Sequence, residues 1–300
     1  MKQPLRRETE GQAYGKVKKN QLSDLIKNIN FRGDEIIMSY EKKYWDLGAK
    51  IEVEKRYPLK WGAPGIPRKG KKNPTPEQIE RQNDWQAVRK LNRLITANFT
   101  SDDYHVVLTF KEKVEREEAK KCLEEFLKEM RKSYRKEGQE LKYIVVTEYK
   151  NTKIHHHIII NDYIAIGSNT IKLIKAIWKK AAEEKMGNPK FVGLYENGDY
   201  KELAEYLVKE TKKTFREKDA CLKKRWSCSR NLVRPEPIKE VVHARTWRKE
   251  PTVPKGYYLE KGSLVNGINP ITGFPYQHYT LIKLVLPEPK EKKLKKPDKV

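Results

Sequence analysis

Residues 75–212 alternate between two hydrophobic patterns, one typical of strands and one typical of helices. The run YHVVLTF at 104–110 is rich in β-branched and aromatic residues and predicts a strand. In 114–135, apolar residues recur every three or four positions, which predicts an amphipathic helix. The same two patterns predict further strands at 141–149, 154–160 and 190–195, and further helices at 76–97, 169–182 and 199–212.

The order of these elements predicts an α+β fold. From residue 104 onward it reads strand, helix, strand, strand, helix, strand, which is the βαββαβ arrangement of ferredoxin-like and RRM-like domains. Only residues 150–153 separate the second strand from the third, so these strands must form an antiparallel hairpin. We therefore expect a central antiparallel sheet with its helices on one face, while the opposite face stays open for a ligand.

The flanks of this core carry weaker patterns and suggest a division into four parts. Residues 1–74 predict a basic N-terminal extension and linker, and 75–237 the central domain. Residues 238–285 alternate apolar and turn residues, which predicts a small β-rich addition. The segment 286–300 has no apolar face, which predicts a disordered basic tail.

The charge of the chain indicates its partners. Lysine and arginine number 65 against 41 aspartates and glutamates, a net charge of +24, so we expect a polyanionic partner. The 16 tyrosines and six tryptophans favour single-stranded nucleic acid over an anionic membrane surface, because aromatic rings stack on bases. A basic soluble protein without such a partner is the alternative.

The N-terminus MKQPLRRETEGQ has no apolar segment that predicts a signal peptide, and no apolar run reaches membrane-spanning length. The three cysteines, Cys122, Cys221 and Cys228, are too few and too widely spaced for a disulfide framework or a zinc site. We expect a protein of the reducing cytoplasm.

Three of the six histidines lie together in the predicted hairpin. Side chains alternate along a strand, so His155 and His157 share one face, while His156 lies with isoleucines on the core face. Closing the hairpin over the predicted turn places Glu148 opposite His155, and directly opposed residues share a face. Two imidazoles and one carboxylate are thus expected on one face, provided that the register does not slip by one residue.

Glu148, His155 and His157 are predicted to hold Mg²⁺ or Mn²⁺. Such a set leaves coordination positions open, which suits a divalent metal that must also bind substrate. A solvated surface patch of polar residues is the alternative interpretation.

His155-His156-His157 resembles the HUH motif of the HUH endonuclease superfamily, in which two histidines flank a bulky residue that is usually apolar. LTF at 108–110 resembles the first motif of the same superfamily. The segments 74–110 and 225–237 are similar to replication-associated HUH proteins of filamentous phages, plasmids and mobile elements. The resemblance covers 75–237 and implies an HUH nuclease domain there.

The resemblance implies a nucleophilic tyrosine on a helix after the histidines. Tyr206 fits, with Lys209 one helical turn further on as a cation that favours phenolate formation. By itself this spacing is a weak signal, and packing of Tyr206 in a helix interface is the alternative. Tyr195 and Tyr200 are rivals, but neither has a lysine three residues later.

A basic segment follows this helix and predicts contact with DNA. Basic residues around an aromatic ring suit the backbone and one stacked base of a single strand, although a basic loop with a buried tryptophan fits equally well. The predicted DNA-binding residues are Lys223, Lys224, Arg225, Trp226, Arg230 and Arg234.

Together these features predict metal-dependent nicking and joining of single-stranded DNA through a 5′-phosphotyrosine intermediate, which starts rolling-circle replication of a mobile element. The expected partners are single-stranded DNA or a DNA hairpin at an origin, a host helicase and a polymerase. GIPRKGKK at 65–72 lacks the final Ser or Thr of a phosphate-binding loop, so unwinding is expected to come from another protein. A relaxase or single-tyrosine transposase, and a non-catalytic nucleic-acid-binding protein, remain open as alternatives.

Overall fold

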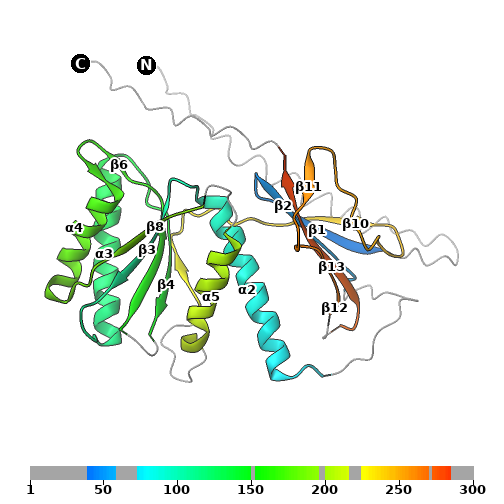
Figure 1. Cartoon of the computed structure of the whole chain (residues 1–300), viewed down its shortest axis with the longest axis horizontal. Helices are drawn as coiled ribbons and strands as arrows, with labels where there is room; N and C mark the ends of the chain where they lie inside the picture. Colours follow the sequence, from blue (N-terminus) through cyan, green and yellow to red (C-terminus); the bar gives the residue numbers. More distant parts are fainter. Residues whose placement is uncertain are drawn as a thin grey trace, which may run out of the picture.

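The structure is a computed structural model, in which two antiparallel sheets lie on either side of the long helix α2 (Pro76–Asn98) (Figure 1). It describes residues 39–58, 73–149, 153–195, 200–215, 224–269 and 272–284. The tight turn at 150–152, most of the predicted linker and the tail 286–300 lie outside the described residues.

The first sheet has the ferredoxin-like order that the sequence predicts. Its strands run β8-β3-β5-β4-β9, and each neighbouring pair is antiparallel. The strands are β3 (Tyr104–Thr109), β4 (Tyr143–Glu148), β5 (His155–Ile160), β8 (Lys190–Gly193) and β9 (Ser227–Cys228). The first and third strands of the βαββαβ core therefore lie side by side at its centre, which confirms the predicted α+β fold class.

Helices α3 (Arg116–Lys136) and α4 (Thr170–Ala182) cover one face of this sheet. Phe126, Met130 and Trp178 are fully buried between these helices and the strands. The two helices of the core thus lie on one face, as predicted. The short strands β6 (Ile164–Ala165) and β7 (Ser168–Asn169) and the 3₁₀ helix η1 (Glu183–Lys185) flank α4.

The opposite face of the first sheet is covered in part by α2 and by α5 (Lys201–Phe215). Leu91 and Ile95 of α2 and Leu207 of α5 pack on Ile144 and Ile159 of the sheet. This corrects the expectation of an open face, because two helices outside the βαββαβ core also bury apolar residues against the sheet.

Local sequence signals set the start of α2. The Thr75 side chain accepts a hydrogen bond from the Gln78 backbone N–H, and the Gln78 side chain accepts one from the Thr75 backbone N–H. This capping box satisfies two donors that a helix N-terminus otherwise leaves without partners, and Pro76 adds a preset helical φ.

The second sheet joins the two flanks of the chain. Its path is β10-β1-β2-β13-β11, and β12 also pairs with β13. The strands are β1 (Tyr40–Asp46), β2 (Lys50–Arg56), β10 (Ile238–Val242), β11 (Tyr257–Leu259), β12 (Val265–Ile268) and β13 (Pro275–Lys283). The predicted β-rich addition at 238–285 therefore shares its sheet with strands from the predicted N-terminal extension.

Helix α2 connects the two sheets through buried ion pairs. Arg93 Nε donates to Glu52 Oε2 at 2.7 Å, and Arg89 Nη1 donates to Glu54 Oε2 at 3.0 Å. The Arg93 guanidinium also lies over the Trp45 ring, 3.3 Å from its centroid. Among the described residues, no helix is both long and apolar enough to cross a membrane.

Candidate active site

The hairpin of β4 and β5 has the register that the sequence predicts. Glu148 pairs with His155 and Val146 pairs with His157, so these side chains share the face on which α2 and α5 lie. His156 points to the other core, where its Nδ1 lies 2.9 Å from Thr147 Oγ1.

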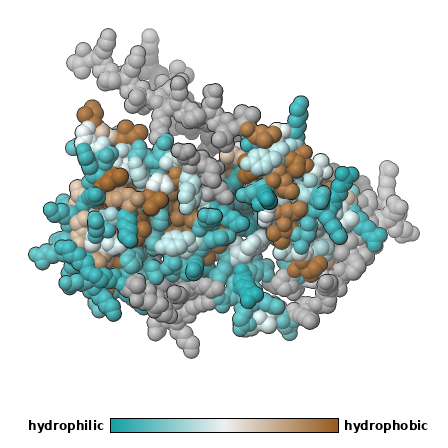
Figure 2. Space-filling model, viewed as in Figure 1, coloured by the Kyte–Doolittle hydropathy of each residue, from teal (hydrophilic) through white to brown (hydrophobic). Residues whose placement is uncertain are grey.

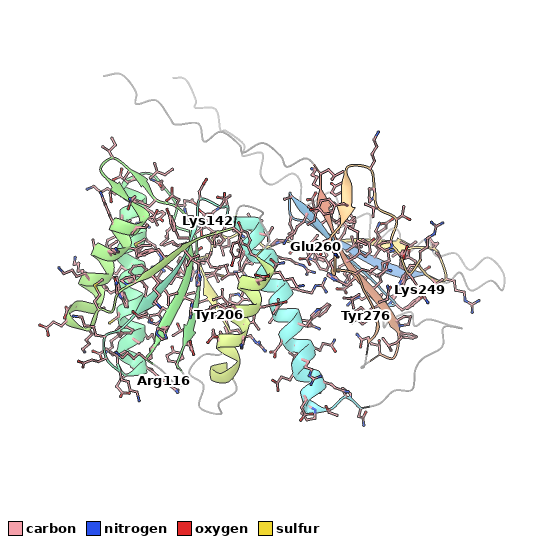
Figure 3. All side chains as sticks on the ribbon, in the orientation of Figure 1. Arg116, Lys142, Tyr206, Lys249, Glu260 and Tyr276 are labelled. Carbon is pink, nitrogen blue, oxygen red and sulfur yellow. The ribbon has the colours of Figure 1, made fainter. Side chains whose placement is uncertain are left out.

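Helix α5 brings Tyr206 against the second of these histidines. The ring centroids of Tyr206 and His157 are 5.4 Å apart, and the rings cross edge to face at 81°. Leu203 and Leu207 are buried, whereas Tyr206 is 42% exposed. Figure 3 shows Tyr206 on the side of α5 that faces the first sheet. The Tyr206 ring therefore lies at the border between the helix interface and solvent.

His105 of β3 completes a row of three rings, and sequence reasoning missed it. Its Nε2 lies 3.3 Å from His157 Nδ1, and the two imidazoles stack with centroids 5.5 Å apart. The Tyr206 ring centroid lies 6.5 Å from that of His105. The signal was present in principle, because β3 and β5 are neighbours in a ferredoxin-like sheet and side chains alternate along each strand.

The imidazoles of this row are held in the neutral form. Burial lowers the pKa of His105 to about 4. Burial, with smaller contributions from the neighbouring histidines, lowers the pKa of His157 to about 3. Burial and Lys190 lower the pKa of His155, against the opposing effect of Glu210. A neutral imidazole keeps one nitrogen lone pair, which is the form that can bind a metal or accept a proton.

Two carboxylates influence the predicted nucleophile. Burial, then Glu210 and Glu148, raise the pKa of Tyr206, because the phenolate is poorly solvated and repelled by negative charge. Glu210 was not among the predicted residues, although its position four residues after Tyr206 places both on one side of α5. Lys209 is exposed on the same helix, and its electrostatic role remains a prediction.

The predicted metal ligands share a face but do not surround a common point. Across the described ranges, no three His, Cys, Asp or Glu side chains are grouped so that they could hold a metal ion. Glu148, His155 and His157 have suitable donor chemistry, but their side chains do not form a ready metal site. No step below is therefore derived through a metal.

Residues 103–215 match a family model described as a replication-associated protein of the ORF2 type. The matched region runs from just before β3 to the end of α5, so it includes the histidine strand and Tyr206. It spans less than half of the chain and supports a replication-associated function for this part. No curated protein and no solved structure gives a significant match.

The predicted DNA-binding segment divides into anchoring and exposed residues. Arg225 Nη2 donates to Asp84 Oδ1 of α2 at 2.6 Å, and Trp226 packs against the core under α2 and α5. Lys224, Arg230 and Arg234 are exposed, whereas Lys223 lies outside the described residues. In this structure Arg225 and Trp226 fasten the segment to the domain, and the exposed cations are the ones that a phosphate backbone can reach.

Proposed function

We propose that this chain is a single-strand DNA endonuclease and ligase that starts rolling-circle replication of a mobile element. The observation that carries the proposal is the contact between Tyr206 and His157, on the sheet face that also bears Glu148 and His155. The match of residues 103–215 to replication-associated proteins supports the same function.

In the proposed reaction, the Tyr206 phenol oxygen attacks the scissile phosphorus. A bond forms between this oxygen and phosphorus while the bond from phosphorus to the 3′ oxygen breaks, and a proton passes from the phenol to the leaving oxygen or to solvent. The products are a 5′-phosphotyrosine link and a free 3′-hydroxyl. Because the ester link keeps the bond energy, a later 3′-hydroxyl can reverse the step and rejoin the strand without ATP.

Tyr206 needs help to ionise, because burial and two carboxylates raise its pKa in the resting structure. A phenol with a pKa near 10 or above is a weak nucleophile at neutral pH. We assign Lys209, one turn further along α5, as the cation that favours the phenolate once the strand is bound.

A divalent cation, Mg²⁺ or Mn²⁺, is proposed to bind together with the DNA, held by His155, His157 and Glu148. When bound, such a cation polarises phosphate oxygens and offsets the charge that builds up on them. The three side chains must turn toward one another to hold it, since they do not converge in the present structure.

The proposed substrate is single-stranded DNA or a DNA hairpin at a replication origin. Lys224, Arg230 and Arg234 are exposed on the segment that is fixed to α2, and they can follow the phosphate backbone. The free 3′-hydroxyl would prime a host polymerase, and a host helicase would separate the strands.

The test is incubation with a 5′- or 3′-labelled hairpin oligonucleotide in Mn²⁺, with and without EDTA. Tyr206→Phe is expected to abolish nicking and the covalent adduct while DNA binding stays within about twofold of the wild type, because only the attacking oxygen is lost. Tyr195→Phe is the matched control, since Tyr195 is also exposed and lies shortly before α5, and it should cut normally.

Cleavage that persists in Tyr206→Phe would contradict the assignment of the nucleophile. A wild-type protein that shifts the oligonucleotide without cutting it would instead support a non-catalytic nucleic-acid-binding protein. Efficient transfer of an excised DNA segment to a second target would favour a transposase, and nicking that requires a double-stranded transfer origin would favour a relaxase.

A further inference from the structure

His105 is a buried histidine that the proposed reaction does not use. It lies on β3, opposite Ile159 of β5 and Val192 of β8, in an otherwise largely apolar part of the sheet. Its closest polar contact is the 3.3 Å approach of its Nε2 to His157 Nδ1. The near-parallel rings, 20° from coplanar, give both imidazoles a defined orientation.

The contact with His105 decides which nitrogen of His157 remains available. The Nδ1 of His157 faces His105, so Nε2 is the ring nitrogen left for chemistry at the site. Two neutral imidazoles can share one proton across this contact in two ways. Either His105 Nε2–H donates to His157, which puts the remaining proton of His157 on its Nε2, or His157 Nδ1–H donates to His105.

Only the second arrangement leaves a lone pair on His157 Nε2. A histidine whose Nε2 carries hydrogen cannot bind a cation or accept a proton through that atom. Second-layer partners that receive Nδ1–H commonly fix the tautomer and the ring plane of a working histidine.

We propose that His105 is a positioning residue, which accepts a hydrogen bond from His157 Nδ1–H and so keeps the Nε2 lone pair of His157 available at the site. This inference rests on the proposed function, because it assigns His157 a working Nε2. His105 itself lies further from the nucleophile, with its ring centroid 6.5 Å from that of Tyr206, against 5.4 Å for His157.

Glutamine and methionine at position 105 separate this role from simple packing. The two side chains have nearly the same length and volume, but only the glutamine amide oxygen can accept a hydrogen bond from His157. His105→Met is expected to lower the kcat for nicking of the labelled hairpin oligonucleotide in Mn²⁺ by about 10–100-fold, with KM for the DNA unchanged. His105→Gln should return kcat to within a few fold of the wild type.

The tautomer of His157 gives a second readout that does not depend on cutting. Long-range ¹⁵N–¹H correlation spectra of the metal-free protein should show the Nδ1–H form of His157 in the wild type and in His105→Gln, and a mixture with the Nε2–H form in His105→Met. This spectrum tests the inference even if the wild type does not cut DNA, an outcome that would contradict only the proposed function. Equal kcat in the Met and Gln variants, or a His157 tautomer that is the same in all three proteins, would overturn the inference.

Discussion

At the scale of single residues, the electrostatic surroundings of Tyr206 oppose its ionisation. Glu210 lies one turn further along α5 and acts on both Tyr206, whose pKa it raises, and His155, whose pKa it also raises. The carboxylate of Glu210 therefore stabilises the protonated forms of both groups. In the resting structure this keeps the predicted nucleophile protonated.

Glu210→Gln is expected to lower the pKa of Tyr206 and the pKa of His155 together, because a negative charge near both groups is removed. NMR titration of ¹³C-labelled tyrosine and histidine in the metal-free protein measures both values, and Tyr206→Phe identifies the tyrosine signal. Glu205→Gln is the control, since Glu205 is exposed on the same helix. If both pKa values stay at their wild-type positions in Glu210→Gln, the carboxylate does not act on this pair.

The sequence predicted part of the residue row at this site. The tight hairpin fixed the register that pairs Glu148 with His155, because a short turn leaves few alternatives. His105 and Glu210 were missed for a different reason. Their relevance depends on which strand pairs with β5 and on how α5 lies across the sheet, and both depend on contacts between segments far apart in the chain.

At the scale of elements, α2 is the structural link between the two sheets. One side of it packs with α5 on the first sheet, and another side places Arg89 and Arg93 against β2. Burial alone would raise the pKa of Glu52, but His278, Arg93 and Arg89 outweigh it and hold this pKa at about 2. A buried carboxylate between two arginines therefore ties α2 to the second sheet.

Glu52→Gln is expected to reduce the free energy of unfolding by about 3 kcal/mol at pH 7, because it leaves buried arginine charge uncompensated. Urea denaturation measures the change. Glu240→Gln removes an exposed carboxylate from the same sheet, where Glu240 pairs with Lys42, and should cost less than about 1 kcal/mol. Equal losses in the two variants would argue against a special role for the buried pairs.

The pH dependence of this contribution follows from the lowered pKa of Glu52. The unfolded chain takes up the proton at higher pH than the folded protein does. The stability that Glu52 contributes is therefore fully present above its ordinary pKa and is lost as the pH falls toward about 2.

The elements of the central domain could be predicted closely, whereas the second sheet could not. The start of α2 was readable from Thr75, Pro76 and Glu77, because capping is a local effect. By contrast, β1 pairs with β10, almost two hundred residues later in the chain. No local pattern specifies such a partner, so the N-terminal strands were placed in an extension separate from the C-terminal strands.

At the scale of the whole molecule, the positive charge is the dominant feature. The net charge is +24, and polar side chains cover most of the face seen in Figure 2, with apolar residues in separate patches. The exposed cations of the segment after α5 lie on the matched domain's own core, since Ser227–Cys228 forms the edge strand β9 beside β4. This arrangement suits a strand of DNA that runs along the domain.

Replacing Lys224, Arg230 and Arg234 with glutamine should weaken binding of single-stranded DNA at low salt and make it less salt-dependent. Each lost phosphate contact is expected to reduce the slope of log K against log salt by about 0.7. Fluorescence anisotropy over a salt series measures this slope. The control removes three charges from α3 on the other face of the sheet, Lys120, Lys128 and Lys132, and an equal fall in slope there would contradict a localised DNA site.

The central claim is that Tyr206 becomes covalently joined to DNA. Mass spectrometry of a tryptic digest after reaction with the hairpin oligonucleotide tests it most directly, because Tyr206 is the only tyrosine in the peptide 202–209, whereas Tyr195 and Tyr200 both fall in 191–201. The account predicts a nucleotide adduct on peptide 202–209, absent in Tyr206→Phe. An adduct on 191–201 or on any other peptide, or strand scission with no adduct at all, would contradict it.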